Sequence, residues 1–175
     1  MKAFFEKSEG LKGTVTVPPD KSISHRAAII SALSGGTCHV NNYSGSADCL
    51  STLRCLEALG VNLVYREGRL SVTGLGVGRF KQPERVLDAG NSGTTMRLLA
   101  GAVAPSPVRV TITGDQSLRK RPMERVAEPI RMMGASVETA DTTGCPPLTV
   151  RGGCLKGIDY SPGVASAQVK SCLLL

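Results

Sequence analysis

Aromatic residues are scarce in this sequence. Tryptophan is absent, and three phenylalanines and three tyrosines make up 3% of the 175 residues. Proteins that bind single-stranded nucleic acid stack bases on aromatic side chains, so this scarcity disfavours that class. Dense runs of lysine and arginine are also missing, and the nearest is Arg119-Lys120-Arg121. The sequence therefore offers little that would bind a nucleic acid.

Long apolar stretches are absent as well. No run approaches the roughly 20 apolar residues that a membrane-spanning helix needs. The opening, MKAFFEKSEG, has no apolar stretch long enough for a secretory signal. From these absences we expect a cytoplasmic protein that does not enter a membrane.

The cysteines lack the spacing of a metal site. None of the six forms a Cys-x-x-Cys pair, and only His25 and His39 are available as further nitrogen ligands. Zinc sites usually show tighter spacing. We therefore expect no metal, and free thiols in a reducing compartment, at Cys38, Cys49, Cys55, Cys145, Cys154 and Cys172.

What the sequence has in excess is positive charge. Lysine and arginine number 21 against 14 acidic residues, a formal net charge of +7. Such a surplus suits a nucleic acid, an anionic membrane or a small acidic ligand. With the first two disfavoured, small anions are the best explanation, and a solvated basic surface is the alternative that charge alone leaves open.

A repeated order of elements predicts an α/β fold. Apolar residues spaced as on an amphipathic helix cover 46–59, and Gly60, a strand at 61–65, the turn Glu67-Gly68 and a strand at 69–73 follow. The same order returns in a helix at 122–133, opened by Pro122, then Gly134, a strand at 135–139 and a return strand at 148–150. Two copies of one supersecondary unit are therefore expected.

Further elements fill the remaining sequence. We expect strands at 13–17, 86–88 and 108–113, and helices at about 24–33, at 93–103 and from about Ser166. Pro18-Pro19 follows the first of these strands and is typical of a crossing point between parts of a fold. The last four residues, CLLL, lie inside an apolar helical pattern with no stop signal. We therefore expect the sequence to be a piece of a longer protein.

Several of the expected helices begin in ways that suit an anion, because a helix start offers free backbone N–H groups and a positive dipole end. In PDKSISHR, Ser22 is a candidate N-cap, with Lys21 and Arg26 nearby. DAGNSGTT brings two glycines to a helix start without being a Walker A loop or a G-x-S-x-G elbow. In GDQSLRKRPM, Arg121 directly precedes a helix, and Ser166-Ala167-Gln168 is a weaker fourth case. Each segment alone is also compatible with an ordinary capped helix.

Taken together and in this order, the segments resemble one family. PPDKSISHR, LDAGNSGTTMRLL, GDQSLRKRPMERV, MMGA and SAQVKS are similar to signatures of the 5-enolpyruvylshikimate-3-phosphate synthases. The resemblance runs from about Leu11 to the end and covers less than half of a complete family member. It implies a two-domain α/β architecture, the enolpyruvyl transferase fold, in which βαβαββ units form an inside-out barrel. Residues 1–19 would belong with the second domain, and 20–175 would form an incomplete first domain with units at about 20–80 and 81–153 and a third begun at about 156.

The resemblance also implies an activity. The family transfers the enolpyruvyl group of phosphoenolpyruvate to the 5-hydroxyl of shikimate 3-phosphate and releases phosphate, in the shikimate pathway to chorismate and aromatic amino acids. It uses no metal and no organic cofactor, and a monomer is expected. Glyphosate is expected to inhibit it where glycine stands at the position of Gly93. The acid–base carboxylates of the family lie outside this chain, so the chain alone is expected to be inactive.

Residue roles follow from the same resemblance. Contacts to shikimate 3-phosphate are implied for Lys21, Ser22, Arg26, Ser166 and Gln168. Contacts to phosphoenolpyruvate are implied for Lys21, Asn91, Gly93, Thr94, Arg121 and Gln168. Lys21 is the one expected catalytic residue, and Asp48 and Arg97 match positions near the site. Ala167 stands where relatives have a second serine, so no hydroxyl role is implied there.

Two alternatives remain at this point. The related UDP-N-acetylglucosamine enolpyruvyl transferases carry a reactive cysteine in the loop before the arginine that matches Arg121. Here that loop has Gln116 and Ser117, and no cysteine occurs between Cys55 and Cys145. A non-catalytic anion-binding domain is the other alternative.

Overall fold

Two similar α/β units and one further helix make up the folded part of the chain in the computed structural model, which describes residues 3–7, 10 and 12–175. The first unit consists of α1 (Lys21–Leu33), β1 (Thr37–Val40), α2 (Ala47–Ala58), β2 (Asn62–Arg66) and β3 (Arg69–Thr73). The second consists of β4 (Leu87–Asp88), α3 (Gly93–Val103), β5 (Arg109–Thr113), the 3₁₀ turn η1 (Leu118–Lys120), α4 (Glu124–Met133), β6 (Ser136–Glu138) and β7 (Leu148–Arg151), and α5 (Ala167–Leu174) follows.

The two sheets repeat one strand order. In the first sheet the order is β1-β3-β2, and both pairings are antiparallel. In the second it is β4-β5-β7-β6, so β5, β7 and β6 repeat the first order and β4 is added in parallel beside β5. The predicted α/β repeat is confirmed, and it extends further along the chain than the helix–strand–strand part recognised in the sequence.

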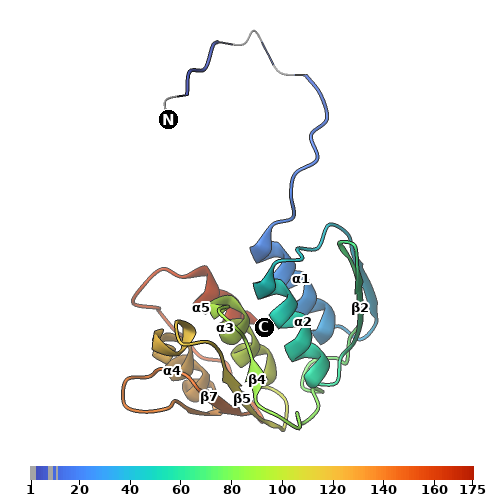
Figure 1. Cartoon of the computed structure of the whole chain (residues 1–175). Coiled ribbons are helices and arrows are strands. Elements are labelled where there is room, and N and C mark those ends of the chain that lie inside the picture. The colour runs from blue at the N-terminus through green and yellow to red at the C-terminus, as the bar shows by residue number, and fades with distance from the viewer. Residues whose placement is uncertain (1–2, 8–9, 11) are drawn as a thin grey trace.

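The helices pack against one another, and the sheets lie outside them (Figure 1). Helix α3 is central because it contacts α1, α2, α4 and α5. Apolar side chains on one face of each sheet, such as Leu70 and Val72 in β3 and Val110 and Ile112 in β5, point toward these helices and are buried. The arrangement confirms the expected inside-out architecture, with helices in the core and strands around it.

Turn residues explain why several predicted helix and strand ends agree with the structure. Glu67 and Gly68 both have positive φ angles, 46° and 76°, as a two-residue hairpin between twisted strands requires. Gly60 and Gly134, predicted as helix stops, have φ angles of 88° and 111°, a region that glycine adopts without steric cost. The helix predicted at 93–103 is found with those bounds, and the strand predicted at 69–73 is found with its own.

Two predicted helix starts are wrong by a few residues. Helix α1 begins at Lys21 rather than near Ser24, because Asp20 caps it: its Oδ1 accepts a hydrogen bond of 2.7 Å from the backbone N–H of Ile23. Ser22 is therefore inside the helix and is not its N-cap. Helix α4 begins at Glu124, so Pro122 belongs to the preceding connection rather than to the first turn.

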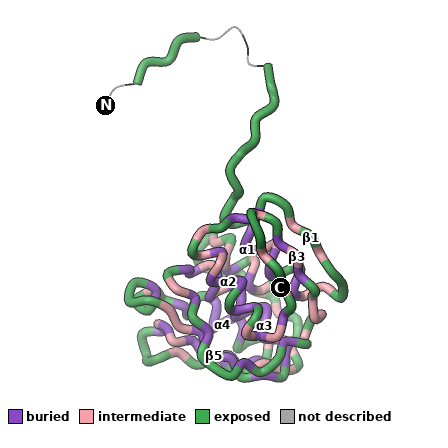
Figure 2. Tube along the Cα trace, turned by 45° about the vertical axis from the view of Figure 1, so that its right-hand side comes forward, coloured by how far each residue is buried: buried purple, intermediate pink, exposed green. Residues whose placement is uncertain are grey.

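The strand predicted at 13–17 is not formed. Residues 12–20 are extended and exposed, and lead away from the folded body (Figures 1 and 2). A strand needs a partner, and residues 13–17 pair with no described strand: the carbonyl oxygen of Val17 accepts a hydrogen bond of 3.3 Å from Asn42 Nδ2. Conversely, β1 was not predicted, since its sequence TCHV lacks a clear apolar alternation. None of the described helices has the length and apolar character to cross a membrane.

Candidate anion-binding site

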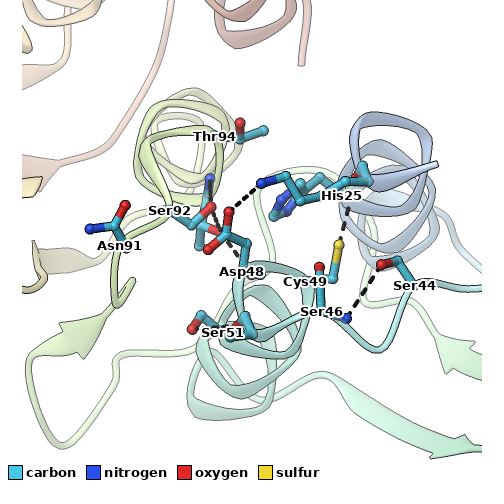
Figure 3. Close-up of polar contacts among 12 residues, drawn as sticks. His25, Ser44, Ser46, Asp48, Cys49, Ser51, Asn91, Ser92 and Thr94 are labelled. Atoms are coloured by element: carbon cyan, nitrogen blue, oxygen red, sulfur yellow. Dashed lines mark hydrogen bonds and ion pairs between the residues drawn. The ribbon is translucent and has the colours of Figure 1, made fainter. Parts of the chain in front are cut away.

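The first turns of four helices lie at one end of the helical core. Lys21 Nζ, at the start of α1, lies 2.7 Å from Asp48 Oδ2 in the first turn of α2. The Gln168 side-chain amide, at the start of α5, donates to Thr94 Oγ1 at the start of α3, at 2.9 Å. Figure 3 shows the starts of α1, α2 and α3 side by side, with Asp48 directed toward the other two. Four positive helix ends therefore converge, which favours anions.

At the start of α1 the two cations have different surroundings. The hydrogen bond and the negative charge of Asp48 raise the pKa of Lys21 above its usual value, so this lysine stays charged. Arg26 is turned toward α5: its Nη2 donates to Ser171 Oγ at 2.7 Å and to the carbonyl oxygen of Ala167 at 3.3 Å, and its Nη1 donates to the carbonyl of Ser22. Arg26 thus joins α1 to the end of α5 that faces the site.

The loop before α3 is built around short polar contacts. Gly90 has a φ angle of 58°, and its N–H donates to Asp88 Oδ1. Ser92 caps α3 by accepting from the backbone N–H of Thr95 at 3.1 Å. This geometry holds the loop open at Gly93, where backbone N–H groups of the first helical turn have no intrahelical partner.

Asn91 is fixed in place by charged groups on both sides. Its Nδ2 donates to Asp115 Oδ2, and its Oδ1 accepts from Arg121 Nη2, each at 2.6 Å. Arg121 also donates to Ser117 Oγ at 3.3 Å. The hydrogen bond from Asn91, followed by that from the N–H of Leu118, lowers the pKa of Asp115, so this carboxylate stays ionised.

Two guanidinium groups lie beside Gly93. A Cβ atom added at Gly93 would be 3.0 Å from Arg97 Nη1 and 3.3 Å from Arg121 Nη1, so glycine leaves room for both guanidinium groups to approach the backbone. Arg97 Nη1 also donates to Gln168 Oε1 at 2.6 Å, and its buried Nε has no partner. Burial and then the charges of Arg125 and Arg121 lower the pKa of Arg97, which indicates positive charge in excess.

The guanidinium groups on this side of the site have no carboxylate in direct contact among the described residues. Among the described residues, neither Arg97 nor Arg121 forms an ion pair with an acidic side chain, whereas Lys21 has Asp48. An incoming anion would supply the missing negative charge, and guanidinium groups suit phosphate and carboxylate because they donate in a planar fork. The arrangement can therefore bind compact anions next to the free backbone N–H groups at the start of α3.

The sequence-predicted residues fall into two neighbouring groups. Lys21, Ser22, Arg26 and Asp48 lie around the starts of α1 and α2. Around the starts of α3 and α5 lie Asn91, Gly93, Thr94, Arg97, Arg121, Ser166 and Gln168. Ser166 caps α5 as predicted, accepting from the N–H of Val169 at 3.4 Å.

Sequence reasoning missed several residues that hold the site together. Asp20 and Asp115 fix a helix start and the Asn91 side chain, and an aspartate followed by a helix or a turn is a signal that could have found both. His25, Thr52 and Thr95 form a buried hydrogen-bonded chain between the two groups, which no local pattern indicates. In the part of the chain that the structure describes, no cluster of three or more His, Cys, Asp or Glu side chains could hold a metal ion.

Comparisons with known proteins identify relatives of this chain. The sequence model of the family described as EPSP synthase (3-phosphoshikimate 1-carboxyvinyltransferase) matches residues 5–175. The 3-phosphoshikimate 1-carboxyvinyltransferase of Alkaliphilus metalliredigens is 50% identical over 169 residues, which is 97% of this chain and 40% of the relative. The enzyme of the same name from Bacillus velezensis is 47% identical over 170 residues, again 97% of this chain and 40% of the relative.

A solved structure shows the same fold. The EPSP synthase of Acinetobacter baumannii superposes with a TM-score of 0.88 at 44% sequence identity, covering 93% of this chain and 37% of that one. The chain thus spans about 40% of the length of the curated relatives it matches. Because the family match extends over nearly the whole chain, at high identity and with the same fold, this chain belongs to the EPSP synthase family.

Proposed function

We propose that this chain is the amino-terminal part of an enzyme that transfers the enolpyruvyl group of phosphoenolpyruvate to the 5-hydroxyl of shikimate 3-phosphate, releasing phosphate. The observation that carries the proposal is the pair of guanidinium groups, Arg97 and Arg121, held beside Gly93 with no carboxylate partner among the described residues. Each substrate carries one phosphate and one carboxylate, so a site for both needs several cations and free backbone donors.

Each substrate would draw on both groups of residues. Lys21, Ser22, Arg26, Ser166 and Gln168 would bind shikimate 3-phosphate. The loop of Asn91, Gly93 and Thr94, with Arg121, Lys21 and Gln168, would bind phosphoenolpyruvate. Support comes from the link of Arg26 to α5 and from the positions of Lys21 and Gln168, each of which joins the first turns of two helices. Both substrates would then bind beside the same set of cationic side chains.

The proton transfers need groups from elsewhere. Of the carboxylates that contact the predicted site side chains, Asp48 is paired with Lys21, and Asp115 is bonded to Asn91 and to the N–H of Leu118. A carboxylate whose oxygens are occupied by such contacts is poorly placed to exchange a proton with a substrate. We therefore assign the acid–base steps to residues outside this chain, with Lys21 as the catalytic cation that this part contributes.

The same proposal divides the protein into domains. Residues 20–175 would form an incomplete first domain with units at about 20–80 and 81–153 and a third begun at about 156. Residues 1–19 would belong with a second domain. In favour of this, Phe4, Phe5 and Val15 are 91%, 94% and 82% exposed, which is unusual for apolar side chains that have their final neighbours.

The test compares the chain with the full-length protein. Phosphate release from shikimate 3-phosphate plus phosphoenolpyruvate is measured for both, and calorimetry measures the binding of shikimate 3-phosphate to both. We expect turnover by the full-length protein only, and weak binding of shikimate 3-phosphate by the chain. A full-length protein without turnover would overturn the activity. Turnover by the chain within about tenfold of the full-length protein would overturn the division of labour.

A further inference from the structure

A chain of buried polar side chains runs between the helices beneath the site. His25 Nδ1 lies 2.7 Å from Thr52 Oγ1, Thr52 Oγ1 lies 2.7 Å from Thr95 Oγ1, and Thr95 Oγ1 donates to Ser92 Oγ, also at 2.7 Å. Threonines 52 and 95 are fully buried, and His25 and Ser92 are 1% and 2% exposed. Figure 3 shows His25 on α1 and Ser92 at the start of α3, the two ends of this chain. We call these four residues the relay.

The relay does not evidently stabilise the folded protein. Burying polar groups costs free energy unless every group is hydrogen-bonded, and His25 Nε2 is buried without a partner. Burial lowers the pKa of His25 to about 4, so the imidazole is neutral at neutral pH and adds no charge to the site. Apolar side chains of similar size would fill the same space at lower cost, so another role for the polar groups is indicated.

The position of each member points to that role. His25 lies one helical turn after Lys21 in α1, and Thr52 lies one turn after Asp48 in α2, so each contacts the turn that carries a site residue. Ser92 and Thr95 flank Gly93 and Thr94 at the start of α3. In addition, Thr95 Oγ1 lies 3.3 Å from the carbonyl oxygen of Asp48, whose carboxylate holds Lys21. The relay therefore connects the α1 side of the site to the α3 side.

The hydrogen bonds of the relay must all run in compatible donor-to-acceptor directions. Each hydroxyl has one proton, so it donates one hydrogen bond at a time. When His25 Nδ1 donates to Thr52, the Thr52 proton is free for Thr95, which in turn donates to Ser92. When Nδ1 accepts instead, the Thr52 proton is used toward His25 and the bonds along the chain must rearrange. Hydrogen bonds in such buried chains strengthen one another, so the members change together.

We propose that His25, Thr52 and Thr95 are positioning residues that couple the two halves of the site, so that an anion held at the start of α3 raises the affinity of the start of α1 for shikimate 3-phosphate. The inference rests on the proposed function. Because coupling between two ligands is reciprocal, it can be measured from either side. None of the three side chains needs to touch a substrate.

The experiment measures this coupling at equilibrium in the full-length protein. Calorimetry gives the dissociation constant of shikimate 3-phosphate with and without a saturating concentration of inorganic phosphate, a pair of ligands that cannot react with each other. Thr52→Val keeps the side-chain shape but removes the hydroxyl. We expect a coupling factor of at least about fivefold in the parent and less than about twofold in Thr52→Val.

Two matched variants keep the result specific. Thr52→Ser retains the hydroxyl and should retain the coupling factor of the parent. Thr111→Val removes a hydroxyl from another threonine pair, Thr111 and Thr149 at 2.9 Å in the second sheet, and should also leave the factor unchanged. Should Thr52→Val fail to fold, Thr95→Val and Thr95→Ser supply the same comparison, because Thr95 is the next member of the relay.

The outcomes separate the inference from the function on which it rests. Unchanged coupling in Thr52→Val, or no coupling in a parent protein that binds shikimate 3-phosphate and turns over, would overturn the relay and leave the proposed function in place. A parent protein that does not bind shikimate 3-phosphate would overturn the proposed function itself. Loss of coupling in Thr111→Val to the same extent would show a general loss of packing and would also overturn the relay.

Discussion

The first helices of the two units begin in opposite ways. Asp20 caps α1 and Ser92 caps α3, and the next residue is Lys21 in one helix and Gly93 in the other. The same structural position therefore carries a long cationic side chain in the first unit and no side chain in the second. One helix start can reach an anion through an ammonium group, and the other lets backbone and two neighbouring arginines approach it directly.

The units also differ in one strand. In the second unit, β4 precedes α3 and pairs in parallel with β5, joining Leu87 to Ile112 and Asp88 to Thr113. The corresponding stretch before α1 is residues 13–17, which lie extended and exposed rather than beside β1. A repeated unit can thus keep its helices and its antiparallel strands without forming its first strand.

The largest expected effect tests whether the two units pack alike, at the glycine that directly follows the last strand of each unit, Gly74 after β3 and Gly152 after β7. An added Cβ at Gly74 would overlap the carbonyl oxygens of Ser31 and Ser34 at the end of α1, and one at Gly152 would overlap those of Ser106 and Ala104 after α3. Because backbone is on the other side of each contact, neither can relax cheaply. We expect Gly74→Ala and Gly152→Ala each to lower the free energy of unfolding by about 3 kcal/mol, measured by urea denaturation.

Gly153→Ala is the matched control. An added Cβ there meets nothing within 4 Å, so the free energy of unfolding should change by less than about 0.5 kcal/mol. If Gly74→Ala were as mild as the control while Gly152→Ala was severe, the two units would not share this packing rule.

The next largest effect concerns the cationic start of the first unit. Arg26→Ala removes a guanidinium that donates to Ser22, Ala167 and Ser171 and that we place against shikimate 3-phosphate. We expect a loss of about 1.5–3 kcal/mol in binding of shikimate 3-phosphate to the full-length protein, measured by calorimetry. Arg69→Ala, on the outer face of the first sheet, should leave that affinity unchanged. Equal affinity in the parent and Arg26→Ala would remove Arg26 from the site.

A pH dependence distinguishes the buried side of the first unit. His25 has a folded-state pKa of about 4, below its usual 6.5, so the unfolded chain binds a proton there first as the pH falls. The folded state therefore loses stability from about pH 6.5 down to pH 4, by about 2 kcal/mol near pH 5. In His25→Gln that part of the loss should disappear in urea denaturation across this range. A parent and a variant with parallel pH profiles would contradict a buried neutral imidazole.

The smallest effect concerns the bare start of the second unit. Gly93→Ala places a methyl group 3.0 Å from Arg97 Nη1 and 3.3 Å from Arg121 Nη1, and both are ends of flexible side chains that can shift. We expect stability to change little, whereas glyphosate inhibition of the full-length protein should weaken by about five- to tenfold, or roughly 1 kcal/mol. Gly35→Ala, at an open position, is the control. Identical inhibition curves for the parent and Gly93→Ala would show that space at this position is not limiting.

Local chemistry determined which parts of the fold could be predicted. The turn at Glu67-Gly68 and the helix stops at Gly60 and Gly134 were predictable because a positive φ angle restricts the residue type. Residues 14–17 alternate threonine and valine as a strand would, yet no described strand pairs with them, and a sequence pattern cannot supply the pairing. Strand β1 has the opposite property, since its sequence gives a weak signal and its pairing with β3 and its contacts with α1 arise only in the fold.

The site shows the same limit. Physical reading of the sequence found the helix starts near Lys21, Gly93, Arg121 and Ser166, and the resemblance to a family supplied their roles, which stay predictions. The sequence did not show that Asp20 rather than Ser22 caps α1, because both residue types are good caps and the starting point of the helix decides between them. Nor could it show the relay, which exists only because three helices pack together.

The contact between Lys21 and Asp48 bears on ionic strength. The two atoms lie 2.7 Å apart, with 54% of the lysine side chain and 25% of the aspartate side chain exposed, so the ammonium already has a counter-ion before any ligand arrives. An anion that binds there exchanges with a carboxylate instead of meeting a bare charge. Added salt, which screens exposed charges beyond about 8 Å at physiological concentration, then opposes both the old pair and the new one. Anion affinity should consequently fall less steeply with salt at Lys21 than at Arg121, whose charge no described carboxylate pairs with.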